Sequence, residues 1–159
     1  MLFRSPIHHG VEMLQSAGSA ECASLEGKKT EKPSIDQWLR EAKTAPEAEM
    51  VGMYLIHHGV VRATARSLVR QGDREAKPVI GMQFSCDREK IELAVANAKK
   101  MEGIYSIRVW LNEGELQVGD DIMQVLIGAD IRPHAVQALE KLVGDIKTTC
   151  VMEKELFGD

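Results

Sequence analysis

The chain has few cysteines, and none of them are spaced as a pair. Three of its 159 residues are cysteine, and no two stand in a Cys-x-x-Cys arrangement. They are Cys22, Cys86 and Cys150. This usage argues against a disulfide framework and against a structural zinc site, and it is typical of proteins in the reducing cytosol. We therefore expect a cytoplasmic protein.

Long apolar runs are also missing. No run reaches the roughly 18–20 residues that a membrane-spanning helix needs. Near the N-terminus, His8, His9 and Glu12 interrupt the apolar stretch that a secretory signal peptide requires. The sequence therefore predicts neither a membrane span nor a secretory signal.

The chain has fewer basic residues than acidic ones. Lys and Arg number 20 against 24 Asp and Glu, which gives a net charge of −4 at pH 7. Such a chain has no overall basic field that would attract nucleic acid. Its 44% hydrophobic and 28% charged residues are ordinary for a globular protein, and its length suits one domain with one core.

Residues 1–33 differ in composition from the rest of the chain. Residues 16–32 are rich in Ser, Ala, Gly, Glu and Lys, and they offer almost nothing to bury. We therefore expect residues 1–33 to form a flexible leader and residues 34–159 to form the folded domain. The adjacent His8 and His9 lie in this leader, where such a pair is more often inert than metal-binding.

From Ser34 onward, helical and strand patterns alternate. Ser34 and Gln37 form a capping-box pattern before an amphipathic helix that ends before Pro46. Asp87 caps a second expected helix that runs to Met101. Strands are expected at residues 51–62, 79–84, 104–111, 122–127 and 150–156, and the fourth is apolar enough to be central. This order predicts an α+β fold with a mixed or antiparallel sheet and flanking helices.

The last third of the chain places three cations around one helix. Asp130 is its expected cap, and Pro133 fits only its first turn. The predicted buried stripe consists of Val136, Leu139, Leu142, Val143 and Ile146. Arg132 lies at the helix start, where free N–H groups favour an anion, Lys147 follows the helix end, and Lys154 lies on the next strand. The pattern indicates either a local anion site or three solvated surface cations.

Residues 62–77 form an expected polar loop that contains four arginines. These are Arg62, Arg66, Arg70 and Arg74. The loop is either a solvated basic segment or a mobile flap over an anionic ligand. On the preceding strand, His57 and His58 point to opposite faces, so they cannot chelate one ion together. We interpret both histidines as structural.

Three motifs occur in the same order as in a known family. Residues 59–62 match a Gly-x-Val-Arg at a strand end, and residues 114–122 match a Gly-x-Leu-x-x-Gly-[Asp/Glu] turn. Arg132, Lys147 and Lys154 have the spacing of the family's Arg and two Lys residues. On these motifs, residues 51–156 resemble the large, catalytic subunit of molybdopterin synthase. The resemblance implies a fold of the α/β-hammerhead type.

The resemblance also implies sulfur transfer in molybdenum cofactor biosynthesis. In that family, a ubiquitin-like small subunit inserts a C-terminal Gly-Gly tail that carries a thiocarboxylate, and sulfur passes to a cyclic pterin phosphate to give molybdopterin. By position, the implied catalytic residues are Lys147 and Lys154, and the implied substrate-binding residues are Arg62, Arg70, Arg132 and His134. No metal and no cofactor is implied, and the expected assembly is a homodimer within a heterotetramer.

Several positions depart from the family pattern. Residues 111–112 replace a His-Arg pair, Ile131 replaces a His, and Glu153 replaces a Trp. These positions concern substrate contacts and partner docking more than the lysine pair. Cys150, close to both lysines in sequence, is a rival sulfur carrier. The alternative function is a non-catalytic relative that keeps the fold and binds a pterin or another anion.

Overall fold

The computed structural model describes residues 31–159 of the chain. Most of the expected leader, residues 1–30, lies outside the described part. Lys32, in the last residues of that expected leader, makes an ion pair with Asp121, with 2.6 Å between Nζ and Oδ2. Within residues 31–159, no helix is both long enough and apolar enough to cross a membrane.

Two antiparallel sheets form the framework of the described chain. The first sheet has the order β1 (Met53–Val60), β5 (Asp121–Ala129), β3 (Ile104–Leu111), so the expected apolar strand is indeed central. The second has the order β4 (Gly114–Gln117), β2 (Val79–Cys86), β6 (Val151–Phe157). All neighbouring strands run antiparallel. The predicted α+β fold with an antiparallel sheet is confirmed.

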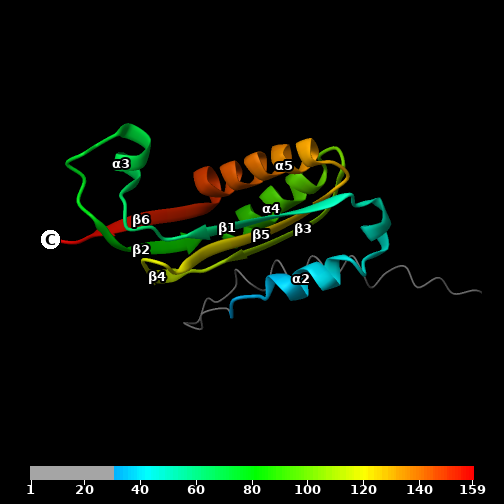
Figure 1. Cartoon of the computed structure of the whole chain (residues 1–159), viewed down its shortest axis with the longest axis horizontal. Helices are drawn as coiled ribbons and strands as arrows, with labels where there is room; N and C mark the ends of the chain where they lie inside the picture. Colours follow the sequence, from blue (N-terminus) through cyan, green and yellow to red (C-terminus); the bar gives the residue numbers. More distant parts are fainter. Residues whose placement is uncertain (1–30) are drawn as a thin grey trace, which may run out of the picture.

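Helices cover the two faces of the first sheet unequally (Figure 1). On one face, α4 (Arg88–Lys99) and α5 (Arg132–Asp145) pack over the main core. On the other face, α2 (Ile35–Ala42) lies alone among the described helices. Its Trp38 packs with Trp110 and Leu126 in a second, smaller cluster. A short 3-10 turn, η1 (Pro46–Met50), leads from α2 into β1.

The expected caps of two helices are present. The Ser34 hydroxyl accepts a hydrogen bond from the backbone N–H of Gln37 at 3.3 Å, at the start of α2. The Asp87 carboxylate accepts from the N–H of Lys90 at 3.3 Å, at the start of α4. Each bond satisfies a backbone donor that the first helical turn leaves without a partner. Both helix starts were therefore correctly predicted.

The expected cap of α5 is wrong. Ile131 is the residue before its first turn, and it makes no side-chain capping bond. Asp130 instead accepts a hydrogen bond from the N–H of Ile131 at 2.6 Å and lies 2.6 Å from Nδ1 of His134. The predicted buried stripe of this helix also needs correction, because Val136 is 38% exposed. The residues of α5 that are fully buried are Ala135, Ala138 and Leu142.

Two elements were not expected from the sequence. A short helix, α3 (Arg66–Gln71), interrupts the predicted polar loop, and β4 forms within the predicted turn region. After α5, the chain makes a wide π-turn, η2 (Ile146–Cys150), before it enters β6. The hydroxyls of Thr148 and Thr149 donate to the carbonyls of Gly144 and Asp145 in this turn. Lys147 therefore lies in the wide turn between α5 and the second sheet.

Candidate functional site

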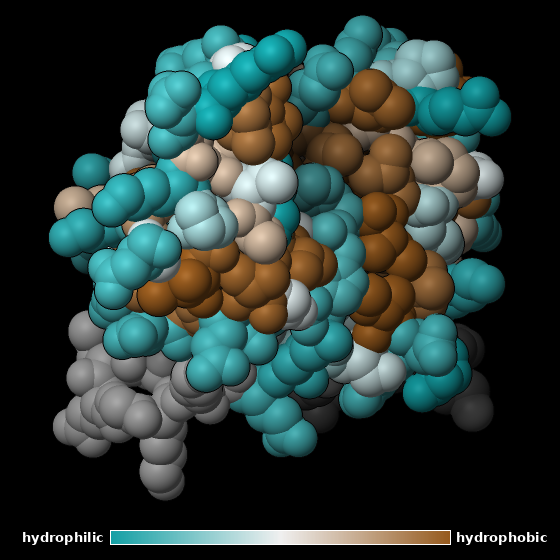
Figure 2. Space-filling model, turned by 60° about the vertical axis from the view of Figure 1, so that its left-hand side comes forward, coloured by the Kyte–Doolittle hydropathy of each residue, from teal (hydrophilic) through white to brown (hydrophobic). Residues whose placement is uncertain are grey.

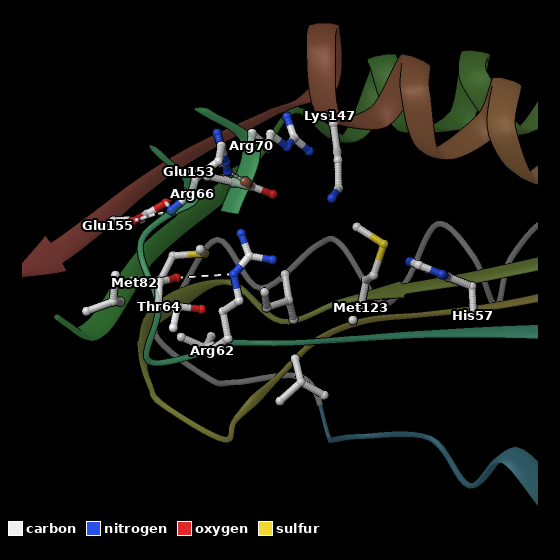
Figure 3. Close-up of a pocket in the computed structure, with 15 residues that line it drawn as sticks. His57, Arg62, Thr64, Arg66, Arg70, Met82, Met123, Lys147, Glu153 and Glu155 are labelled. Carbon is white, nitrogen blue, oxygen red and sulfur yellow. Dashed lines mark hydrogen bonds and ion pairs between the residues drawn. The ribbon is translucent and has the colours of Figure 1, made fainter. Parts of the chain in front are cut away.

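A cavity of about 210 Å³ opens where the two sheets meet α3 and η2. Its charged and polar lining comes from five separate elements or loops. The lining side chains that carry charge or hydrogen-bonding groups are His57, Arg62, Thr64, Arg66, Arg70, Lys147, Glu153 and Glu155. Apolar side chains, among them Met82 and Met123, complete its wall. Figure 3 shows these residues around the open space.

Three cations that the sequence indicated come together here. Arg62 follows β1, Arg70 lies on α3, and Lys147 lies in η2. Figure 3 shows Lys147 and Arg62 extending toward one another from opposite walls of the cavity. The Nε of Arg62 donates to the carbonyl oxygen of Thr64 at 3.1 Å, which holds the guanidinium plane. Such a set of cations on a concave surface is suited to binding an anion.

A fourth cation, Arg66, is paired within the protein. Its guanidinium forms an ion pair with the carboxylate of Glu153. Its backbone N–H donates to both carboxylate oxygens of Glu155, at 3.0 and 3.2 Å. Glu153 and Glu155 both belong to β6, so these contacts fasten the start of α3 to the second sheet.

His57 lies in the cavity wall, and its pKa is lowered. Burial is the main cause, because it disfavours the charged imidazolium. The nearby positive charge of Lys147 lowers the pKa further, and His58 adds to the effect. His57 is therefore a neutral imidazole at neutral pH. We interpreted it from the sequence as a structural residue, and its place in the cavity was not foreseen.

The neighbouring His58 faces away from the cavity. Its Nε2 is in contact with the carboxylate of Asp121, the same carboxylate that pairs with Lys32. Burial alone would raise the pKa of Asp121, but the hydrogen bonds from Lys32 and His58 hold it below its usual value. The opposite orientation of the two histidines is thus as the strand alternation predicted.

Arg132 and His134 lie at the far end of α5 from Lys147. Arg132 is its first residue and is exposed, whereas Lys147 follows its last turn. At 14 residues, α5 separates these positions by about 20 Å. His134 is bound to Asp130 and lies 3.6 Å from a carboxylate oxygen of Glu102. The hydrogen bond from His134 is the main reason that the pKa of Asp130 is lowered.

Lys154 also lies outside the cavity. Side chains alternate along β6, so Glu153 and Glu155 line the cavity while Lys154 is exposed on the opposite face. There it stands across from Gln83 of β2. Of the six site residues expected from the sequence, Arg62, Arg70 and Lys147 line this cavity within one protomer.

Cys150 is 3% exposed and packs in the main core. Its Sγ lies 3.5 Å from the carbonyl oxygen of Asp145, within the π-turn. It does not line the cavity. In residues 31–159, no three His, Cys, Asp or Glu side chains are grouped so as to hold a metal ion.

The face around this end of the molecule carries exposed apolar side chains. Ile80, Met152 and Phe157 on β2 and β6 are each more than half exposed. Figure 2 shows hydrophobic patches that are divided by hydrophilic atoms on the side turned toward the viewer.

Comparison with known families gives one match over most of the described chain. The family model described as MoaE protein matches residues 29–149. The match spans the first sheet, α3, α4, α5 and the start of η2, and it includes Arg62, Arg70 and Lys147. No curated protein sequence matches the chain significantly.

Solved structures share the fold at low sequence identity. A molybdopterin synthase from Staphylococcus aureus is 18% identical with a TM-score of 0.62, covering 81% of this chain and 88% of its own. A molybdopterin biosynthesis MoaE protein from Burkholderia ambifaria is 17% identical with a TM-score of 0.59, covering 80% and 85%. A complex of subunits 1 and 2 of the molybdopterin-converting factor from Helicobacter pylori contains a chain that is 16% identical with a TM-score of 0.55, covering 77% and 75%. At these identities, the likeness shows a common fold.

Proposed function

The chain belongs to the MoaE protein family, and on that premise we propose that it is the large subunit of a molybdopterin synthase. Membership of this family supports a role in molybdenum cofactor biosynthesis. The proposed reaction moves sulfur from a thiocarboxylated, ubiquitin-like small subunit to a cyclic pterin phosphate. The Helicobacter pylori structure, a complex of two subunits, supports the small-subunit partner.

The observation that carries the proposal is the meeting of Arg62, Arg70 and Lys147 in one cavity. Both reactants are anions, one a phosphate and the other a thiocarboxylate at the end of a peptide tail. Guanidinium groups bind phosphate and carboxylate through planar, charge-assisted hydrogen bonds. We assign Arg62 and Arg70 to anion binding.

Lys147 is the proposed catalytic group. Its side chain reaches into the cavity from the π-turn and has no hydrogen-bond or ion-pair partner within residues 31–159. An amine that extends into the cavity is placed to exchange a proton with the reactants during sulfur attack and acyl release. Lys154 is the proposed second lysine. Because it is exposed on the outer face of β6, it acts in this scheme only if a partner chain completes the site.

Reconstitution tests this function. The full-length chain is mixed with a thiocarboxylated small subunit and the cyclic pterin phosphate, and the dithiolene-bearing product is measured. The matched control contains a small subunit that ends in an ordinary carboxylate. Product that depends on the thiocarboxylate supports the proposal, and no product with active partner proteins refutes it.

A non-catalytic relative that binds an anion is the second candidate. It is favoured by the position of Lys154 outside the cavity and by the carboxylates of Glu153 and Glu155 inside it. Binding of the pterin phosphate without turnover in the same assay would select this alternative. We propose a cytoplasmic location and a homodimer within a heterotetramer for either function.

A further inference from the structure

Two carboxylates lie in the wall of the otherwise cationic cavity. The side chains of Glu153 and Glu155 are only 10% and 16% exposed. Burying a carboxylate away from water costs free energy unless the group gains partners of opposite charge or hydrogen-bond donors. Arg66 supplies both kinds of partner, through its guanidinium to Glu153 and through its N–H to Glu155.

These contacts also hold α3 in place. The residue before α3 is Ala65, which has no side chain that can cap the helix. Glu155 accepts the first backbone N–H instead, although it lies far away in the sequence. A six-residue helix is too short to be stable alone, so its position depends on such tertiary contacts. Arg70, on the same short helix, is positioned in the cavity wall through them.

The charge that remains for a ligand is small. Four cations line the cavity, namely Arg62, Arg66, Arg70 and Lys147, and two of their charges are offset by the glutamates. Arg66 is therefore already occupied by anions that belong to the protein itself. Three cations remain free to contact a ligand, and the two carboxylates repel any anion in proportion to its charge.

We propose that Glu153 and Glu155 are positioning residues that also weaken anion binding in the cavity, and that they do so more strongly for more highly charged anions. They keep Arg66 occupied, hold α3 and therefore Arg70 in place, and reduce the attraction that the remaining cations exert on an anion. The inference rests on the proposed function, in which the cavity receives a phosphate. It adds two positioning residues to that site.

Calorimetric titration of the full-length chain with inorganic phosphate and with pyrophosphate, at low ionic strength, tests the proposal. Glu153→Gln keeps the side-chain shape and removes the charge. We expect it to tighten phosphate binding about threefold and pyrophosphate binding about tenfold, because repulsion grows with ligand charge. The matched control is Glu115→Gln, which removes an exposed carboxylate from the same sheet outside the cavity. Equal affinities for Glu153→Gln and Glu115→Gln, for both anions, would overturn the proposal.

A double-mutant cycle separates pairing from direct binding by Arg66. In Arg66→Gln, the glutamates lose their partner, so we expect both anions to bind more weakly by at least about tenfold. Adding Glu153→Gln to that variant should restore most of the affinity. A loss that the second substitution does not restore would mean that Arg66 binds the anion itself, and this result also overturns the proposal.

Hydrogen exchange in the absence of ligand tests the structural part independently. Glu155→Gln weakens the acceptor for the N–H of Arg66, so amides of residues 66–71 should exchange at least about tenfold faster, while those of α4 stay unchanged. Unchanged exchange in α3 refutes the positioning role. If the wild-type chain binds neither anion, the assignment of Arg62 and Arg70 to anion binding fails, and this measurement still decides whether the glutamates hold α3.

Discussion

Replacing Lys147 with alanine should abolish sulfur transfer and leave the fold intact. The side chain is exposed and has no hydrogen-bond or ion-pair partner within the described residues, so we expect a change in unfolding free energy within about 0.5 kcal/mol. For a chain of this size, that corresponds to a shift in melting temperature of no more than about 2 °C. General acid–base catalysis contributes about 10²–10⁴ in rate, so the transfer rate should fall by that factor.

The assay is single-turnover sulfur transfer with saturating small subunit and pterin phosphate. The matched control is Lys141→Ala, which removes an exposed lysine of α5 that pairs with Asp145 at 3.1 Å, away from the cavity. Lys147→Arg should also be inactive, since a guanidinium keeps its proton. Cys150→Ser tests the rival sulfur carrier. Transfer within about tenfold of wild type in Lys147→Ala, with loss in Cys150→Ser, would refute the lysine mechanism.

Lys147→Ala has a second expected effect, on the titration of His57. The positive charge of Lys147 is one of the causes that lower the pKa of this imidazole. Removing the charge should therefore raise the His57 pKa, as followed by the NMR chemical shifts of its ring. Burial, the larger cause, remains, so the pKa should stay below its ordinary value. An unchanged pKa would show that the lysine is held farther from the ring than the structure indicates.

Four further predictions concern stability and assembly. Burial lowers the pKa of His57 in the folded chain, so the unfolded chain binds the proton first as the pH falls. The free energy of unfolding should therefore decrease as the pH drops through about 6.5, the ordinary pKa of histidine. Denaturant melts should show that His57→Gln removes this part of the pH dependence. Leu142→Ala empties a fully buried position and should cost about 3 kcal/mol in a urea melt, whereas the exposed Val136→Ala should cost less than about 1. Deleting residues 1–33 should leave the melting temperature nearly unchanged, and a drop of more than about 8 °C would refute the expected flexible leader. Light scattering at tens of micromolar should report a dimer rather than a monomer.

Two strands of the first sheet followed directly from the sequence pattern. Alternation along β3 predicted residues 104–111, which are the bounds observed. The near-continuous apolar run of β5 predicted a central strand, and it pairs with both β1 and β3. α3 was missed because residues 66–71 have little apolar periodicity. Its helical state depends on Glu155, a contact between residues far apart in the chain that no local pattern reports.

The cations of the candidate site were predicted from the sequence, but its two glutamates were not. Arg62 and Arg70 were expected to bind the substrate and Lys147 to be catalytic, and all three line one cavity. The glutamates were missed because the register of β6 on β2 decides which side chains of β6 face the cavity. That register depends on the conformation of the preceding π-turn. A shift by one residue there would exchange Lys154 for Glu153 in the wall. No feature of the sequence fixes that register, because β6 is only partly buried along its length.

The position of Arg132 leads to a last prediction, which concerns the protomer to whose cavity this residue contributes. Within one protomer, Arg132 and Lys147 are separated by the length of α5, about 20 Å, which no single small anion spans. If both residues act on one substrate, Arg132 must serve the cavity of a second copy. Arg132→Ala and Lys147→Ala homodimers should then each be inactive. When equal amounts of the two variants have exchanged subunits, half of the dimers contain one copy of each variant. Each mixed dimer holds one intact site out of two, so about a quarter of the wild-type activity should return. Mixing that restores nothing, with exchange verified by mass spectrometry, would mean that Arg132 takes no part in a shared site.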